Sequence, residues 1–135
     1  MVELSRKIYT EMLEHVHNGY PNEACGVLAG SNGNIVKHYP AVNAADEPET
    51  FSIIAAPELL RIWNDIESQE WDVFAYYHSH PRTQAYPSPR DIAYAQNWPG
   101  TYYLIFTLKD GPEHPVLRAF LIQNGEVQEE ETHIV

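Results

Sequence analysis

VFAYYHSHP, residues 73–81, is an apolar and aromatic run that ends in two histidines and a proline. Its composition predicts a buried strand over 73–78. Alternate residues of a strand point to the same side, so His78 and His80 can reach one metal ion while Ser79 faces away. Two imidazoles make a weak site, because a catalytic zinc ion usually has three protein ligands and an open position for water. The pattern therefore predicts a third ligand nearby.

The third ligand is expected from Ser88-Pro89-Arg90-Asp91, which follows His80 after only seven residues. Serine followed by proline is typical of a helix N-cap and first helical residue, so a short helix is predicted over 89–97. Folded back over the strand end, this helix would offer the Asp91 carboxylate to the histidines. A capping box is the alternative, in which Asp91 accepts a hydrogen bond from the Ser88 N–H. Both interpretations can hold together, and the place just after the histidine pair favours metal binding.

A zinc-dependent hydrolase also needs a group that takes a proton from water and passes it to the leaving amine. Glu23 is the candidate, because it directly precedes the apolar segment 24–29, which is expected to be a central strand. Most other glutamates lie on predicted helix faces or in the acidic C-terminal strand. A solvent-exposed Glu23 without a catalytic role is the alternative.

The rest of the chain predicts a mixture of helices and strands. Leu4, Ile8, Met12 and Val16 recur every four residues and indicate a helix that ends near Gly19. Further elements are a helix at 57–69 and strands at 25–29, 35–39, 51–54, 102–108, 116–122 and 127–134. Helices and strands do not alternate strictly, so the fold class is α+β with a largely antiparallel sheet, in a single domain of residues 1–135.

Composition narrows the classes of function. Nineteen acidic against eight basic side chains give a net charge of -11, which opposes binding to nucleic acid and to anionic membranes. No apolar run reaches the roughly 18 residues of a membrane span, and the start lacks the apolar core of a signal peptide. A cytoplasmic protein is expected, with its single cysteine, Cys25, as a core residue. The other histidines lack metal-type spacing and are expected at the surface: His15, His17, His38, His114 and His133.

Together these residues resemble the JAMM/MPN-plus family of zinc metallopeptidases. The family motif is an upstream glutamate, then H-x-H, seven residues beginning with proline, S, two residues and D. This chain has Glu23, then His78-Ser79-His80-Pro81, then Ser88 and Asp91, and the spacing matches fully. The resemblance to compact bacterial and archaeal members extends over nearly the whole chain through further segments: 23–28, Asn43, Phe51, 57–59 and 103–105.

The resemblance implies a role for each motif residue. It makes His78, His80 and Asp91 the ligands of one zinc ion per chain. It makes Glu23 the general acid/base, and Ser88 a residue that helps to hold the oxyanion or the water. Arg82 and Arg90 flank the site, and the sequence assigns neither a role.

The resemblance also implies a fold and a reaction. The fold is the cytidine-deaminase-like JAMM/MPN fold, a mixed sheet flanked by helices. The reaction is hydrolysis of a peptide or isopeptide bond at the C-terminal tail of a ubiquitin-like or sulfur-carrier protein. Small residues in that tail would let the scissile carbonyl approach the metal. A non-catalytic MPN-type scaffold that only binds partners is the alternative function.

Overall fold

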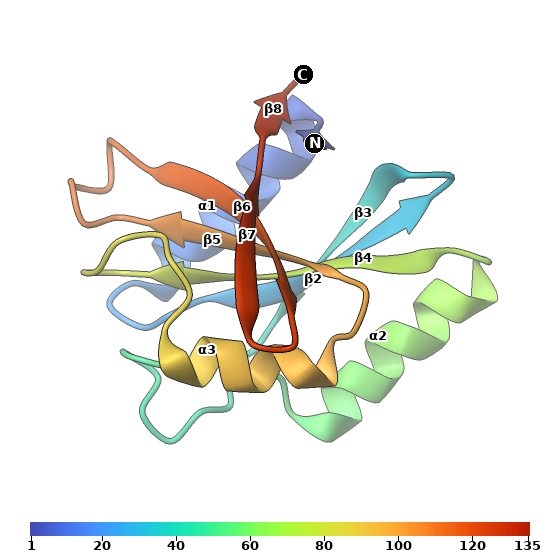
Figure 1. The fold of residues 1–135 in the computed structure, drawn as a ribbon, viewed down its shortest axis with the longest axis horizontal. Helices are drawn as coiled ribbons and strands as arrows, with labels where there is room; N and C mark the ends of the chain where they lie inside the picture. The colour runs from blue at the N-terminus through green and yellow to red at the C-terminus, as the bar shows by residue number, and fades with distance from the viewer.

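A six-stranded mixed sheet forms the centre of the computed structural model, which describes residues 1–135 (Figure 1). The strand order is β3-β2-β4-β5-β6-β7, and only the β4–β5 pair is parallel. The strands are β2 (Cys25–Ser31), β3 (Asn34–Ala41), β4 (Asp72–His80), β5 (Tyr102–Thr107), β6 (Val116–Gln123) and β7 (Glu126–Glu130). This arrangement confirms the predicted α+β class with a largely antiparallel sheet.

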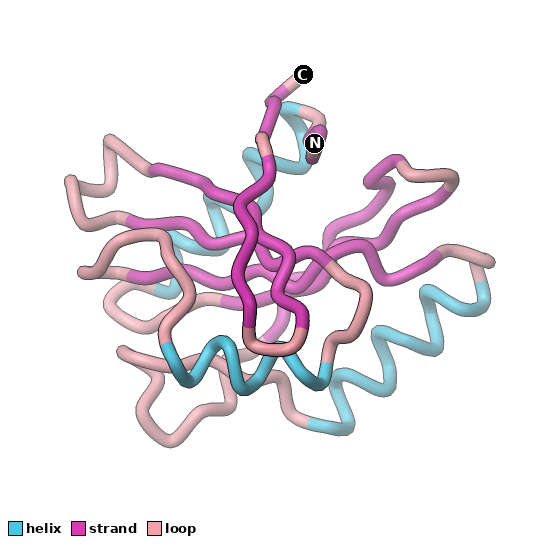
Figure 2. The backbone as a smooth tube through the Cα atoms, in the orientation of Figure 1, coloured by secondary structure: helices cyan, strands magenta, loops and turns pink.

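Helices cover both faces of the sheet (Figure 2). The helices are α1 (Arg6–Gly19), α2 (Ala56–Ser68), α3 (Pro89–Tyr94) and the short 3-10 helix η1 (Ala95–Asn97). Tyr77 of β4 packs in the same buried cluster as Met12 of α1, whereas the preceding Tyr76 packs with Ile62 of α2. Because side chains alternate along a strand, His78 extends from the face that α2 and α3 cover.

The helices α2 and α3 begin where the sequence predicts, whereas α1 begins at Arg6, so Leu4, expected on its apolar stripe, lies before the helix in a short strand. The Ser5 hydroxyl caps α1 by accepting from the Ile8 N–H (3.2 Å), and Ser88 caps α3 in the same way. Pro57 lies in the first turn of α2, where its missing N–H costs nothing. The predicted helix over 89–97 is α3 continued by η1.

The strand predicted at 51–54 is wrong. Only an isolated bridge joins Ile54 to Asn43. The Ile53 carbonyl accepts from the Ala44 N–H (2.9 Å), and the Ile53 N–H donates to the Asn43 side chain (3.3 Å). The loop after β3 thus takes both backbone groups of Ile53, and residues 51–54 form no strand ladder.

The strand predicted at 127–134 is two strands. β7 ends the large sheet, and β8 (Thr132–Ile134) pairs in parallel with β1 (Val2–Leu4), a strand that the sequence did not indicate. The chain changes partner at Glu131, whose carbonyl accepts from the Val2 N–H (2.7 Å). The two termini therefore lie side by side, as Figure 1 shows.

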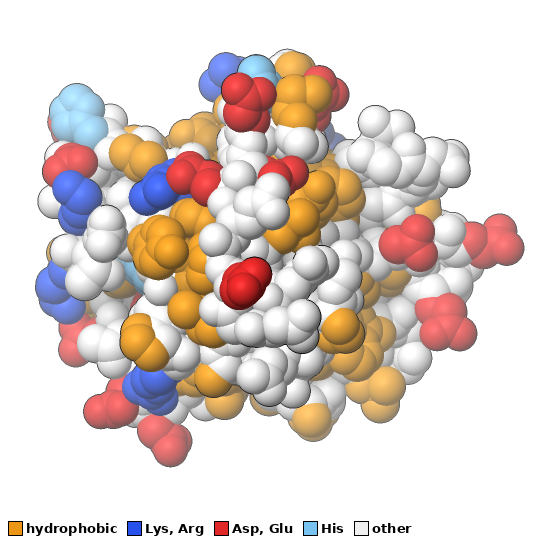
Figure 3. Space-filling model, viewed as in Figure 1, with side chains coloured by type: hydrophobic (Ala, Val, Ile, Leu, Met, Phe, Trp, Pro, Cys, Tyr) orange, Lys and Arg blue, Asp and Glu red, His pale blue; other side chains and the backbone are white.

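The surface reflects the acidic composition. Figure 3 shows acidic side chains scattered over one face, both at its edge and near its centre, rather than gathered in a single patch. None of the helices has both the length and the apolar character needed to cross a membrane.

Candidate metal centre

The C-terminal end of β4 brings two histidines into the interior. In the sheet register His78 lies between Cys25 of β2 and Ile105 of β5, and its side chain is fully buried. His80 follows two residues later on the same side and is 5% exposed. Since β4 is an inner strand of the sheet, its neighbours on both sides fix the backbone that carries the two imidazoles.

Three ligand-type atoms converge at this point. The Nε2 atoms of His78 and His80 lie 3.1 Å apart, and the Oδ2 atom of Asp91 lies 3.2 Å from the first and 3.1 Å from the second. Asp91 belongs to the first turn of α3 and is itself buried. The predicted loop that returns from β4 to this helix therefore brings Asp91 to the histidines.

The hydrogen-bond partners of His80 show which of its nitrogens faces the cluster with a lone pair. His80 Nδ1 lies 2.7 Å from the Gln84 carbonyl, which can only accept, so Nδ1 carries the hydrogen. Nε2 then presents a lone pair to the Asp91 carboxylate, and two acceptors at 3.1 Å repel each other unless a proton or a cation lies between them. His78 Nδ1 is buried and has no hydrogen-bond partner.

The donor set fits a metal ion. Two imidazole nitrogens and one carboxylate oxygen are common zinc ligands. Ligand atoms at about 2.0–2.1 Å from a tetrahedral ion are roughly 3.3 Å from one another. The separations of 3.1–3.2 Å among His78, His80 and Asp91 are close to that value.

The capping box is present as well. The Asp91 N–H donates to the Ser88 hydroxyl oxygen (3.1 Å), and the Ser88 N–H donates to Asp91 Oδ2 (2.9 Å). Both sequence interpretations of Asp91 therefore describe the same carboxylate, because the oxygen that accepts from Ser88 also faces the two imidazoles. The Ser88 hydroxyl donates its own hydrogen to no protein group.

Glu23 lies beside the histidines and is buried, so the solvent-exposed alternative is wrong. One of its oxygens lies within 4.8 Å of a ligand nitrogen of each histidine. Burial raises the pKa of Glu23 from 4.5 to about 8, because desolvation disfavours the carboxylate. Burial also acts to raise the pKa of Asp91, but the charges and hydrogen bonds of the two histidines outweigh it and hold that pKa far below its ordinary value. Such a divergence between neighbouring carboxyl groups is typical of an acid/base pair with separate roles.

Two contacts around the site could not be predicted from the sequence. Ser79 faces away from the histidines as predicted, but its hydroxyl accepts from the Ala24 N–H (2.8 Å) and so attaches β4 to the residue after Glu23. The Gln84 carbonyl orients His80. Every residue has a backbone carbonyl, so the residue type does not indicate this contact.

Two other expectations concern residues away from the cluster. Cys25 is fully buried, as expected, and burial raises the pKa of its thiol to about 12, which rules out a thiolate nucleophile at neutral pH. His38 was expected at the surface, but it is buried. Its Nε2 is hydrogen-bonded to the Tyr77 hydroxyl (2.6 Å).

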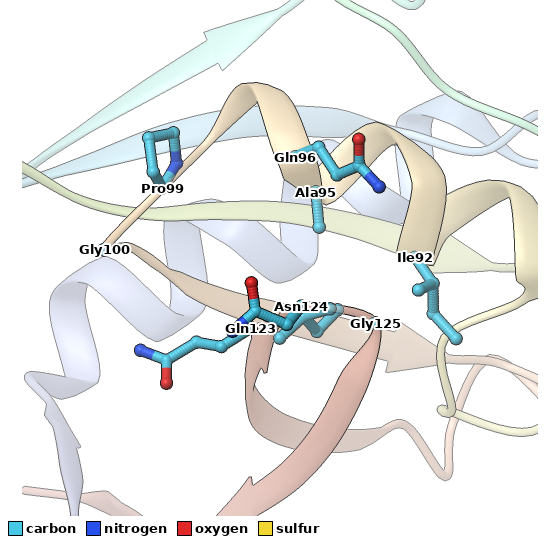
Figure 4. A pocket seen from close by; sticks show the side chains of 9 residues that line it. Ile92, Ala95, Gln96, Pro99, Gly100, Gln123, Asn124 and Gly125 are labelled. Atoms are coloured by element: carbon cyan, nitrogen blue, oxygen red, sulfur yellow. The ribbon is translucent and has the colours of Figure 1, made fainter.

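A cavity of about 620 Å³ lies between α3 with η1 and the β6–β7 turn (Figure 4). Its lining carries no charged side chain and contains none of the four clustered residues. Ile92 lines it, directly after Asp91 in the chain, so α3 borders both this cavity and the cluster.

Comparison with known proteins links the whole chain to one family. The family model for prokaryotic homologs of the JAB domain matches residues 5–123. A CysO-cysteine peptidase from Mycobacterium tuberculosis is 36% identical over 126 residues, which cover 92% of this chain and 84% of that protein. A desampylase from Haloferax volcanii is 37% identical over 100 residues, which cover 70% of this chain and 71% of that protein. A probable TtuB-protein conjugate cleaving protease from Thermus thermophilus is 32% identical over 121 residues, which cover 90% of this chain and 76% of that protein.

Solved structures share the fold. A solution structure of a Desulfitobacterium hafniense protein has a TM-score of 0.87 and 37% identity, covering 100% of this chain and 93% of that one. A structure described as a JAMM metalloprotease-like zinc site in the proteasome and signalosome has a TM-score of 0.63 and 20% identity, covering 100% and 98%. The second likeness concerns the fold alone, and it agrees with the fold that the sequence predicted.

Proposed function

Because this chain belongs to the prokaryotic homologs of the JAB domain, we propose that it is a zinc-dependent peptidase acting on the C-terminal tail of a ubiquitin-like or sulfur-carrier protein. It is a hydrolase of the peptidase class, like the named relatives. The proposal concerns the metal, the residues that hold it and the bond that is cleaved.

The observation that carries the proposal is the convergence of three buried acceptor atoms beside a fourth buried carboxyl group. His78, His80 and Asp91 are the proposed zinc ligands, since their atoms lie 3.1–3.2 Å from one another. Glu23 is the proposed general acid/base. Its Oε1 atom is buried and accepts no hydrogen bond, so this oxygen is available to exchange a proton with substrate or water. A non-catalytic scaffold has no need of such a set.

The chemistry follows from these positions. A zinc ion held there would polarise the scissile carbonyl and lower the pKa of water toward about 7. Glu23 would accept the proton of the attacking water and return it to the leaving amine, a task that suits a carboxyl group with a pKa near neutrality. Ser88 would donate its free hydroxyl hydrogen to the oxyanion. Asp91 would remain ionised throughout.

The relatives' names support the substrate class. The three names are CysO-cysteine peptidase, desampylase and probable TtuB-protein conjugate cleaving protease. An extended tail pairs through its backbone with an exposed strand edge, and small tail residues let its carbonyl approach a buried metal. We therefore infer a peptide or isopeptide bond at the end of such a tail as the bond that is cleaved.

Cleavage of a defined fusion tests the proposal. The zinc-loaded protein is incubated with a ubiquitin-like protein whose glycine-ended tail is joined to a short peptide, and mass spectrometry identifies the products. We expect cleavage after the last tail residue, and none after chelation with EDTA or with the double variant His78→Ala, His80→Ala. Tail binding without cleavage by the zinc-loaded protein would favour the scaffold instead.

A further inference from the structure

The loop between β3 and α2 is organised around one half-buried amide, that of Asn43. Asn43 makes five contacts, all with backbone atoms. The two hydrogens of its Nδ2 face the carbonyl oxygens of Glu23 (2.9 Å) and Phe51 (2.9 Å), and the Pro48 carbonyl shares one of them at 3.3 Å. Its Oδ1 accepts from the N–H groups of Ala45 (3.0 Å) and Ile53 (3.3 Å). A single side chain therefore holds the loop closed and ties it to the residue that precedes β2.

The same loop holds both backbone polar groups of Glu23. The Glu23 carbonyl accepts from Asn43, and the Glu23 N–H donates to the Pro48 carbonyl (2.7 Å). On the other side, Ala24 exchanges two hydrogen bonds with Ser79, which lies between the two histidines of β4. The Glu23 backbone is thus fixed between the loop and the strand that carries the proposed ligands.

The Glu23 side chain has the buried Ser52 hydroxyl near it, which acts by hydrogen bonding to lower the pKa of Glu23. The Glu23 Oε1 atom is buried without a hydrogen-bond partner. The place of the carboxyl group beside the histidines therefore depends on the anchored backbone and on packing, together with the Ser52 hydroxyl. A displacement of about 1 Å at a reacting group can cost on the order of 100-fold in rate.

We propose that Asn43 is the positioning residue of Glu23, acting through the Glu23 carbonyl and through the loop that receives the Glu23 N–H. This inference rests on the proposed function for the catalytic role of Glu23. Two exposed ion pairs also reach the same loop, one between Arg82 and Glu49 (3.3 Å) and one between Arg90 and Glu47 (3.4 Å).

A double-mutant cycle separates positioning from a general structural role. We compare Asn43→Ala in the wild-type and Glu23→Gln backgrounds, with Arg82→Gln as a control that removes an exposed contact of the same loop and keeps Asn43. Asn43→Ala is expected to lower kcat at least 10-fold with KM within about 3-fold and zinc content unchanged. In the Glu23→Gln background the same change should cost less than about 2-fold, because its effect passes through Glu23. Arg82→Gln should resemble the wild type.

Amide hydrogen exchange supplies a readout that needs no substrate. In Asn43→Ala the Glu23 amide should exchange at least 10-fold faster, while the Ser79 amide, which donates to Ala24 on the other side, keeps its protection. The variant Asn43→Asp keeps the acceptor contacts but cannot donate to the Glu23 carbonyl, and it replaces Asn43→Ala if that variant does not fold.

Three results would overturn the inference. Asn43→Ala slows Glu23→Gln as strongly as it slows the wild type, or the Glu23 amide keeps its protection, or neither Asn43 variant folds, in which case Asn43 is structural. Failure of the proposed function looks different: the zinc-loaded wild type cleaves no tail fusion, while the exchange measurement still tests the anchor.

Discussion

At the scale of single residues, Asp91 combines two roles that the sequence alone presents as alternatives. One carboxylate oxygen accepts from the Ser88 N–H at the start of α3 and also faces both imidazoles. The capping box fixes the rotamer of Asp91, because the helix start and the side chain are bonded to each other. A proposed ligand that is already oriented loses little side-chain entropy when an ion binds.

Replacement of Glu23 by glutamine tests the proposed acid/base. Glutamine is nearly isosteric and keeps the burial, but it cannot accept a proton. We expect Glu23→Gln to retain fold and zinc and to lose about 100-fold to 10,000-fold in kcat, the usual contribution of such a group. Hydrolysis of the tail fusion is measured together with zinc content. Wild-type turnover in this variant would mean that Glu23 is structural.

Substitutions at Ser88 separate its cap from its proposed oxyanion role. Ser88→Gly keeps the backbone N–H that binds Asp91, and glycine caps helices tolerably, so the free energy of unfolding should fall by only a few tenths of a kcal/mol. Without the hydroxyl donor, turnover at saturating substrate should fall at least tenfold, since such donors contribute on the order of 100-fold. Ser88→Ala removes the cap as well as the hydroxyl donor, so its free energy of unfolding should fall by about 1 kcal/mol. Equal turnover of Ser88→Gly and the wild type, with Ser88→Ala merely melting earlier, would leave Ser88 a cap alone.

At the scale of elements, His38 connects three of them. It belongs to β3, its Nε2 is bonded to Tyr77 of β4 (2.6 Å), and its Nδ1 lies 3.4 Å from Glu11 of α1. His15 of α1 lies beside it with ring centroids 6.3 Å apart. Burial lowers the pKa of His38 from 6.5 to about 4, although Glu11 acts in the opposite direction. The packing of α1 on the sheet therefore requires a neutral imidazole.

The pH dependence of stability follows with a definite sign. Because the pKa of His38 is lower in the folded than in the unfolded chain, its contribution is fully present above pH 6.5 and is lost as the pH falls toward 4. Between pH 6.5 and 4.5 we expect a loss of about 2 kcal/mol relative to His38→Gln, which cannot titrate. Urea unfolding of both proteins at the two pH values measures this difference. A pH-independent difference would show that His38 has an ordinary pKa.

At the scale of the whole molecule, the sequence predicts what local patterns control. The period of two along β4 places His78 and His80 on one side, and Ser88 with Pro89 marks the start of α3. Partners that are distant backbone atoms could not be predicted. The five contacts of Asn43 are of this kind, and two of them take backbone groups of Phe51 and Ile53 in the segment that was expected to be a strand.

The termini show the same limit. β1 and β8 have three residues each, too few for a periodic pattern, and each exists because the other lies beside it. Residue type likewise does not indicate that His38 is buried, because its environment comes from α1 and β4. Local patterns thus predict that His78, His80 and Asp91 meet at the end of β4, and tertiary contacts determine what surrounds them.

Metal binding should stabilise the whole fold. The three proposed ligands come from β4 and α3, so the complete set exists only in the folded chain, and ions bound there shift the unfolding equilibrium. We expect one zinc per chain, because side chains able to hold an ion gather at one place, where His78 and His80 meet the carboxyl groups of Glu23 and Asp91. At a free zinc concentration of about 100 times Kd, the gain is about 2.7 kcal/mol, which corresponds to a Tm increase of roughly 10 °C for a chain of this size. Residual binding of zinc by the unfolded H-x-H segment would reduce the gain somewhat.

Elemental analysis and thermal unfolding with zinc or EDTA measure the two quantities. The double variant His78→Ala, His80→Ala is the control, and in it both the bound zinc and the increase in Tm should disappear. Because this control keeps Glu23 and Asp91, it also shows whether the two carboxyl groups alone retain the ion. Two results would contradict a zinc site at the end of β4. One is less than about half an equivalent of bound zinc in the wild type after purification with zinc, and the other is an undiminished Tm increase in the double variant.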